Sequence, residues 1–143
     1  MKRTGVIHSA AAVVCLLTLV GCAMSSTAER EKMYILGSAL SKLSASVEST
    51  VRYKDPEEGI SDAELLILAT RHDPGLLEPF ADYKVRVLRQ DKHAVILICT
   101  KDGNTGLMED AGCSSELDRH LWKEEPPKRC EFTVRVQELC PAQ

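Results

Sequence analysis

Three of the four histidines lie near carboxylates in the sequence, which is the pairing that general base catalysis uses. A carboxylate beside an imidazole can orient the ring and fix which ring nitrogen accepts a proton. The pairs are His72 with Asp73, His93 with Asp91, and His120 with Asp118. They fall at a predicted helix end, a hairpin turn and a helix, so we interpret all three histidines as exposed polar residues. Because the sequence also has no Gly-x-Ser-x-Gly elbow, metal-binding histidine pair or phosphate-binding glycine loop, it predicts that the chain is not an enzyme.

A second chemical site is centred on Cys22. Residues 2 and 3 are basic, and residues 10–20 form an apolar run of eleven residues with one threonine. That run is shorter than the ~20 residues of a membrane-spanning helix and is typical of the central part of a signal peptide. It ends in Leu19-Val20-Gly21-Cys22, which resembles the lipobox of bacterial lipoproteins.

The resemblance implies a lipid anchor at Cys22. In such proteins a diacylglycerol is joined to the cysteine sulfur, the peptide bond before it is cut, and the new amino terminus is acylated with a chain such as palmitate. Residues 1–21 would then be a signal peptide, which includes Cys15, and residues 22–27 a lipidated tether. More than one acyl chain, at ~0.8 kcal/mol per buried methylene, is what makes anchoring stable. The alternatives are an ordinary cleaved signal peptide with a chance cysteine, or an uncleaved anchor.

The residue after the anchor implies a destination. Ala23, rather than aspartate, implies transport to the outer membrane, facing the periplasm, by resemblance to lipoprotein sorting in enteric-type bacteria. Cleavage would leave 122 of the 143 residues, with 16 basic and 21 acidic side chains and a net charge of −5. This length predicts a single domain over residues 28–143. The negative charge argues against nucleic acid and against charge-driven binding to anionic lipid.

The first part of the domain has helical patterns. Ser26 and Glu29 have the form of a capping box, which predicts a helix from about Ala28. An apolar stripe then recurs every three or four residues, at Met33, Leu36, Leu40, Leu43, Val47 and Val51. We expect the stripe to cover the domain's own sheet; the alternative is that it docks a partner helix. Ser61 and Glu64 predict a second helix over residues 62–71, and a single helical turn is expected around residues 76–80.

The later part changes to strand patterns. Residues 83–90 alternate between apolar and polar, and residues 94–99 are apolar throughout, which predicts a half-buried strand beside a central one. The Asp102-Gly103 turn predicts a third strand over residues 105–110, with a helix from about Leu107 as the competing interpretation. A short helix over residues 116–122 and a last strand over residues 131–138 follow. The fold class is therefore α+β: a long N-terminal amphipathic helix plus short helices packed on a small antiparallel sheet of three to four strands.

Four cysteines remain after the anchor: Cys99, Cys113, Cys130 and Cys140. An even number in an exported chain predicts two disulfides, and the absence of any Cys-x-x-Cys pair argues against zinc and against a thioredoxin-like site. If residues 131–138 are a strand, Cys130 and Cys140 are too far apart to bond. A strand running back toward the hairpin turn would then join Cys99 to Cys140, and Cys113 to Cys130. No cofactor and no metal is expected.

Arg119, His120 and Trp122 form the cluster best suited to contact a partner, although Trp122 could equally fill a small local core. Two classes of function remain. The first is a non-catalytic envelope lipoprotein that acts as anchor, adaptor or assembly component of a periplasmic or outer-membrane complex, bound to an envelope protein partner. The alternative is a small inhibitor-like or ligand-binding periplasmic lipoprotein module.

Overall fold

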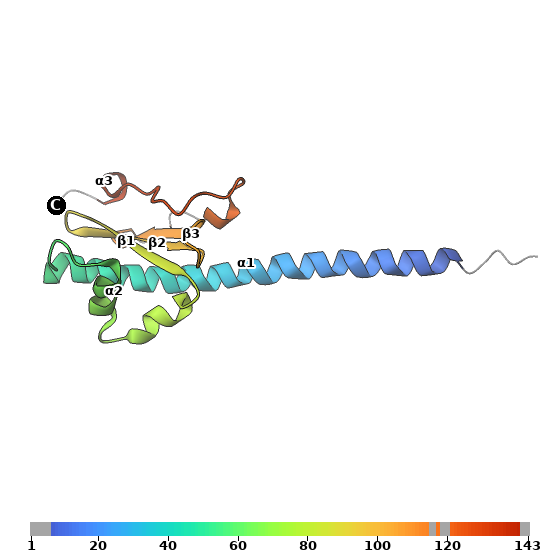
Figure 1. The fold of residues 1–143 in the computed structure, drawn as a ribbon, viewed down its shortest axis with the longest axis horizontal. Coiled ribbons are helices and arrows are strands. Elements are labelled where there is room, and N and C mark those ends of the chain that lie inside the picture. The colour runs from blue at the N-terminus through green and yellow to red at the C-terminus, as the bar shows by residue number, and fades with distance from the viewer. Residues whose placement is uncertain (1–6, 115–116, 118–120, 141–143) are drawn as a thin grey trace, which may run out of the picture. The chain divides into compact units, whose positions relative to one another are not determined.

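The computed structural model describes the backbone of residues 7–114, 117 and 121–140, and within these ranges the side chains from residue 27 onward. It contains helices and a three-stranded antiparallel sheet, which confirms the α+β class (Figure 1). The chain forms two compact units, residues 1–35 and 36–143, and each is described by itself. Among the described residues, no helix combines the length and the apolar character needed to cross a membrane.

The first helix, α1, spans Ile7–Lys54. The predicted start near Ala28 is therefore wrong, and the Ser26–Glu29 capping box lies inside the helix. The physical reason is that the preceding apolar run is rich in alanine and leucine, which are strong helix formers, and contains no proline. Nothing in the sequence between this run and Ala28 interrupts the helical hydrogen bonds, so the two predicted segments form one helix.

The predicted apolar stripe is confirmed. Its residues are buried, including Leu40, Leu43 and Val47, which are fully buried. In the second unit α1 packs on the sheet. A contact between the two is the 3.1 Å hydrogen bond that the Ser44 hydroxyl donates to the carbonyl oxygen of Asp110. The stripe therefore covers the domain's own sheet, as expected.

The second helix, α2, spans Asp62–Thr70, and a 3₁₀ helix, η1, follows over Pro74–Phe80. The predicted capping box is present: the Ser61 hydroxyl accepts a hydrogen bond from the Glu64 N–H, and the Glu64 carboxylate accepts one from the Ser61 N–H. Phe80 is buried at the end of η1, as the sequence predicts for this turn.

The sheet has the order β1-β2-β3, with β1 spanning Lys84–Gln90, β2 His93–Cys99 and β3 Gly106–Ala111. Both pairings are antiparallel, with Ile96 opposite Val87 on one side and Asp110 on the other. β2 is buried from Ala94 to Cys99, so it is the central strand. The third segment is a strand rather than a helix, because the turn that precedes it returns the chain along β2.

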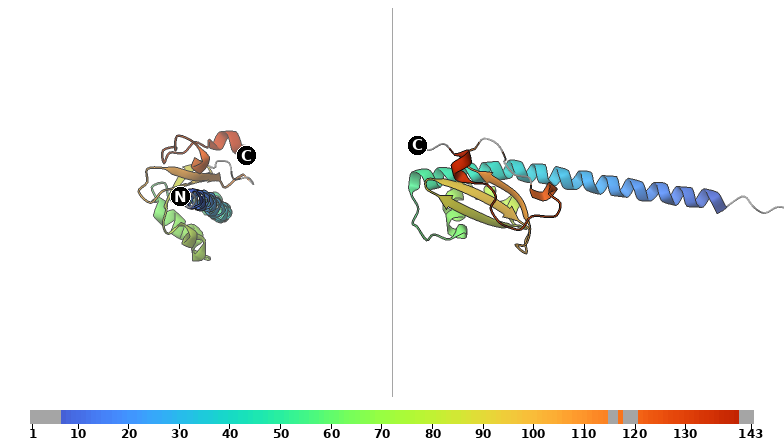
Figure 2. Two further views of the ribbon diagram at one scale, coloured as in Figure 1. Left: turned by 90° about the vertical axis from the view of Figure 1, so that its right-hand side faces the viewer. Right: turned by 90° about the horizontal axis from the view of Figure 1, so that it is seen from above.

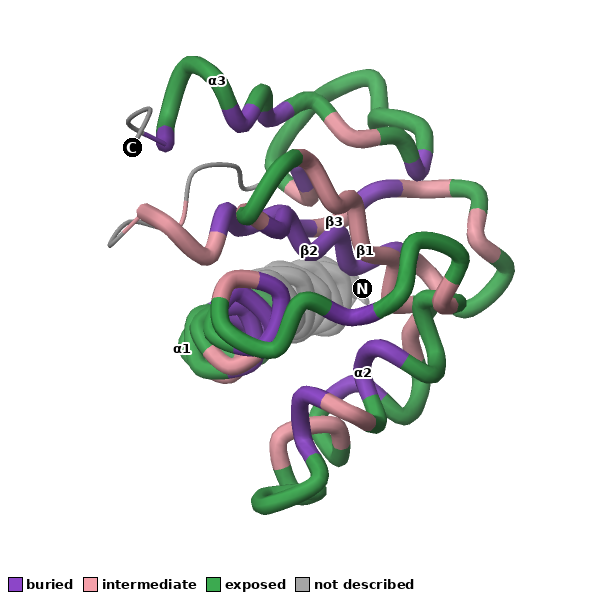
Figure 3. Tube along the Cα trace, turned by 90° about the vertical axis from the view of Figure 1, so that its left-hand side faces the viewer, coloured by how far each residue is buried: buried purple, intermediate pink, exposed green. Residues whose placement is uncertain are grey.

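The C-terminal segment covers the sheet face opposite α1 and α2 (Figures 1 and 2). It contains a 3₁₀ helix, η2, over Leu121–Lys123, and a short helix, α3, over Val136–Leu139. Val134 and Val136 pack against Val95 of β2, and Leu121 packs against Leu97. In Figure 3, the buried residues of β2 lie between α1 and this segment. Most of the predicted helix over residues 116–122 lies outside the described residues.

The predicted last strand over residues 131–138 is wrong, although its side-chain alternation is correct. Val134 and Val136 are buried, while Thr133 and Arg135 are exposed. The segment does not pair with a strand, because its backbone donates to a side chain of the sheet instead: the Thr133 and Val134 N–H groups donate to the carboxylate of Glu109 at 2.9 and 3.2 Å. Residues 131–135 thus lie on the face of the sheet without joining its edge, and the rest of the predicted strand belongs to the helix α3.

The predicted cysteine pairing is also wrong. All four cysteines are in disulfides, but the bonds join Cys99 to Cys130 and Cys113 to Cys140, with Cα atoms 5.6 and 5.7 Å apart. The prediction assumed that the last segment ran toward the β2–β3 turn. In the structure the segment begins at that turn, where the Cys130 N–H donates a hydrogen bond to the carbonyl oxygen of Asn104. From there the segment runs away from the turn. Cys130 therefore meets Cys99, and Cys140 reaches the opposite end of the sheet, where Cys113 follows β3.

Candidate functional site

The residues predicted for contact with a partner are only partly described. Trp122 lies in η2 and is half-buried, next to the buried Leu121. The ammonium of Lys123 lies 5.1 Å from the centre of the indole ring. Arg119 and His120 lie outside the described residues. Cys22, the predicted lipidation site, falls within α1. Trp122 thus borders the local core around Leu121.

The described histidines differ from one another. His72 is exposed, as predicted, and its Nε2 accepts a 2.8 Å hydrogen bond from Arg71. His93 was also predicted to be exposed, and this is wrong: its side chain is 13% exposed, at the start of β2. The reason is that α1 passes this end of the sheet and covers the ring.

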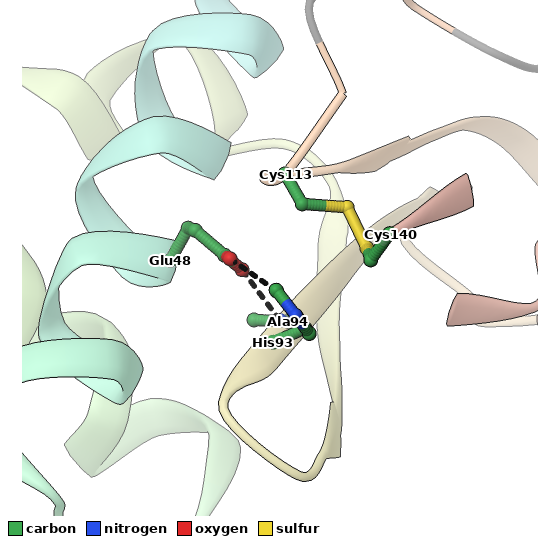
Figure 4. Close-up of polar contacts among 5 residues, drawn as sticks. All are labelled: Glu48, His93, Ala94, Cys113 and Cys140. Carbon is green, nitrogen blue, oxygen red and sulfur yellow. Dashed lines mark hydrogen bonds and ion pairs between the residues drawn. A yellow bond between two sulfur atoms is a disulfide. The ribbon is translucent and has the colours of Figure 1, made fainter. Parts of the chain in front are cut away.

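Glu48 of α1 is the partner of His93 (Figure 4). Its Oε1 lies 2.6 Å from His93 Nδ1, and its Oε2 accepts a 2.8 Å hydrogen bond from the Ala94 N–H. An ionised carboxylate can only accept, so this arrangement places a proton on Nδ1 of His93. Both oxygens of a carboxylate that is 8% exposed are thereby used, and the ring orientation is fixed.

The turn after β3 brings a disulfide to this pair. Gly112 donates its N–H to the carbonyl oxygen of Ala94 at 3.0 Å, and its Cα packs directly on α1. A ring nitrogen of His93 and the sulfur atoms of Cys113 and Cys140 all lie within 4.8 Å of one another. A metal ion would need the two sulfurs as separate thiolates, and here they are bonded to each other. While the disulfide is closed, these residues do not fit a metal.

We expect Gly112→Ala to destabilise the domain. A Cβ atom at this position would lie 2.7 Å from the carbonyl oxygen of Ser44 and still closer to Glu48 Cβ, so the turn would have to move away from α1. Overpacking of this kind lowers the free energy of unfolding by about 1–3 kcal/mol. Urea denaturation of the oxidised protein measures this loss. The matched control is Gly59→Ala, where nothing lies within 4 Å of an added Cβ, and a similar loss there would contradict the packing argument.

A second buried carboxylate belongs to Glu109 of β3, which is fully buried. Besides the N–H groups of Thr133 and Val134, it accepts a hydrogen bond from the Thr133 hydroxyl. This carboxylate fixes the C-terminal segment on the sheet. Its side chain has a positional role, because the described hydrogen bonds of the carboxylate all join it to that segment.

A surface cavity of about 590 Å³ lies beside the connection between α1 and α2. Its apolar lining comes from Pro56, Ile60 and Leu68, and its acidic lining from Asp55, Glu57 and Glu64. Arg89 holds the connection in place by donating to the carbonyl oxygens of Pro56 and Glu57 at 2.9 and 2.8 Å. Hydrogen bonds from the Ser61 side chain and backbone lower the pKa of Glu64, so its carboxyl stays ionised at neutral pH.

Comparison of the chain with protein families, with curated proteins and with solved structures finds no match.

Sequence reasoning missed Glu48 and Glu109. In the sequence, Glu48 is a polar residue beside the apolar stripe with no motif of its own, and Glu109 falls within the predicted third strand. One signal was available for Glu48: it follows Ser44 by four residues, which places both on the same flank of the helix beside Val47. Nothing in the sequence near Glu109 identifies the residues that donate to it, because they lie more than twenty positions later.

Proposed function

We propose that this protein is a non-catalytic cell-envelope lipoprotein, anchored through Cys22 and serving as an adaptor or assembly component of a periplasmic or outer-membrane complex. The observation that carries the proposal is the basic start, the apolar run of eleven residues and the Leu19-Val20-Gly21-Cys22 motif in succession. Any one of these is common by chance, whereas their order and spacing are those of a lipoprotein signal.

The cysteines of the folded unit support an envelope location. Both disulfides link cysteines distant in sequence, with separations of 31 and 27 residues. Stable disulfides of this kind form in oxidising compartments such as the bacterial periplasm and are rare in the cytosol. The proposal thus draws on two independent parts of the chain, the N-terminal motif and the C-terminal cysteines.

Exposed apolar side chains on the second unit support the adaptor role. The stripe of α1 is used in the domain's own core, so a partner must bind elsewhere. Tyr53, in the last turn of α1, is 76% exposed, and Ile67 of α2 is 65% exposed. Aromatic and large aliphatic residues are frequent anchors at protein interfaces, although single exposed apolar residues are also common on monomers. These two residues are therefore the ones to test.

The test is affinity capture of the lipidated protein from a detergent extract. We expect a membrane protein in stoichiometric amount, and we expect its recovery to fall in the Tyr53→Ser/Ile67→Ser variant. Lys92→Ser, which changes an exposed residue of the β1–β2 turn, is the control and should retain the partner. Recovery of no stoichiometric membrane protein from the wild-type chain would contradict the adaptor role.

The cavity beside the α1–α2 connection favours a second candidate function, a small inhibitor-like or ligand-binding module. Its acidic and apolar lining suits a ligand with a cationic group on an apolar body. The same capture experiment distinguishes the two candidates, because recovery of a soluble enzyme instead of a membrane protein favours the second.

A further inference from the structure

The two disulfides lie in different surroundings. Cys99 is fully buried and Cys130 is 8% exposed, within an apolar cluster that includes Leu97 and Leu121. Of the other pair, Cys140 is buried but Cys113 is only half-buried. Thiol–disulfide exchange requires an incoming thiolate to reach a sulfur atom, so the rate depends on access. Cys113 is the most exposed of these four cysteines and is therefore the better target on this criterion.

The second difference is the imidazole. A ring nitrogen of His93 lies within 4.8 Å of both sulfurs of the Cys113–Cys140 pair, and Glu48 holds the ring in place. A nearby imidazolium stabilises a thiolate, and a more stable thiolate is a better leaving group in exchange. Near the other disulfide, the Arg86 guanidinium donates a 2.8 Å hydrogen bond to the Cys130 carbonyl oxygen and lies 5.3 Å from the centre of the Phe132 ring. Its described contacts are thus with a backbone oxygen and an aromatic ring.

We propose that the Cys113–Cys140 disulfide is an exchange site for dithiols, with His93 stabilising the departing thiolate, while Cys99–Cys130 is structural. This goes beyond the proposed adaptor function and does not depend on it. The inference rests on the proximity of one disulfide to an imidazole that is 13% exposed and oriented by a carboxylate, together with the partial exposure of Cys113.

The reaction has two steps. In the first, one thiolate of the dithiol attacks the Cys113 sulfur, a mixed disulfide forms, and the electron pair of the broken bond goes to Cys140, whose thiolate is stabilised by protonated His93. In the second, the other thiolate of the dithiol attacks the mixed disulfide and releases the Cys113 thiolate. The dithiol is oxidised to its disulfide, and after protonation the protein carries two thiols.

Exchange would affect only the end of the C-terminal segment. Cys99–Cys130 would still hold residue 130 at the β2–β3 turn, and Glu109 would still bind Thr133 and Val134. The covalent link between α3 and the turn after β3 would be lost. The domain thus has one covalent attachment that can be released while the other keeps the segment on the sheet.

The test is timed reduction of the full mature chain, purified in detergent, with limiting dithiothreitol at neutral pH. Samples are quenched with iodoacetamide and the alkylated cysteines are mapped by mass spectrometry. We expect Cys113 and Cys140 to be alkylated at least about tenfold faster than Cys99 and Cys130. Equal rates, or faster alkylation of Cys99 and Cys130, would overturn the proposal without bearing on the membrane anchor.

The role of His93 is tested by His93→Gln, which can still donate to Glu48 but cannot carry a positive charge. We expect reduction of Cys113–Cys140 to slow by about tenfold while the rate at Cys99–Cys130 stays unchanged. His72→Gln changes an exposed histidine and should alter neither rate. An unchanged rate in His93→Gln, or equal changes at both disulfides, overturns the role of the imidazole. If this variant does not fold, the comparison of the two wild-type disulfides still decides whether the site exchanges.

Discussion

Replacement of Cys22 by serine is expected to remove nearly all of the protein from the membrane fraction, because serine offers no thiol for the acyl-bearing group. At ~0.8 kcal/mol per buried methylene, the loss of the acyl chains removes the main force that holds the chain at the membrane. The measurement is fractionation of cells that express the wild-type and Cys22→Ser chains, with mass spectrometry of the N-terminal peptide to detect the acyl groups.

The matched control for this experiment is Cys15→Ser. Cys15 lies in the same N-terminal stretch, but within the predicted signal peptide, so its replacement should leave both fractionation and acyl mass unchanged. Unaltered fractionation of Cys22→Ser, with no acyl mass on the wild-type chain, would refute the lipoprotein proposal. Gradient separation of the two bacterial membranes then tests the destination, and we expect the wild-type protein in the outer membrane because Ala23 follows the anchor.

Replacement of Glu109 by leucine is expected to destabilise the attachment of the C-terminal segment to the sheet. Leucine has a similar volume but no acceptor, so the N–H of the buried Val134 and the N–H of the more exposed Thr133 would both lose the carboxylate. Each unsatisfied buried donor costs about 1–3 kcal/mol. Urea denaturation of the oxidised protein should therefore show a loss of about 1–3 kcal/mol, most of it from the buried N–H of Val134.

A conservative variant separates hydrogen bonding from packing. In Glu109→Gln, the amide oxygen can still accept from the two N–H groups, and the amide nitrogen can donate to the Thr133 hydroxyl, which is also an acceptor. We expect this variant to recover most of the stability that Glu109→Leu loses. If both variants are equally unstable, the carboxylate is needed for its charge and the hydrogen-bond explanation is wrong.

The local patterns of the sequence predicted most of the fold. The stripe that contains Leu40 and Val47 has a helical period because one side of α1 must face the sheet. The run from Ala94 to Cys99 is apolar throughout because both faces of β2 are covered. Such patterns record burial, and burial is a local consequence of the fold that each residue must satisfy.

Patterns that depend on a distant partner were not predictable in the same way. Val134 and Val136 alternate with polar residues as in a strand, but the sequence does not reveal that Glu109 replaces the neighbouring strand as hydrogen-bond acceptor. The direction of the segment follows from the contact of Cys130 with Asn104, and the cysteine pairing follows from that direction. The Glu48–His93 pair likewise joins residues from a helix and a strand that are 45 positions apart.

The interleaved order of the two disulfides constrains oxidative folding. In a chain threaded N-terminus first into the periplasm, as proposed for this protein, Cys99 and Cys113 emerge before either of their native partners. An oxidase acting on cysteines in the order of their arrival would join these two and trap a non-native ring. For a chain exported in this way, the native pairing therefore requires that oxidation waits until the last cysteine has been exported, or that a disulfide isomerase reshuffles the first bond.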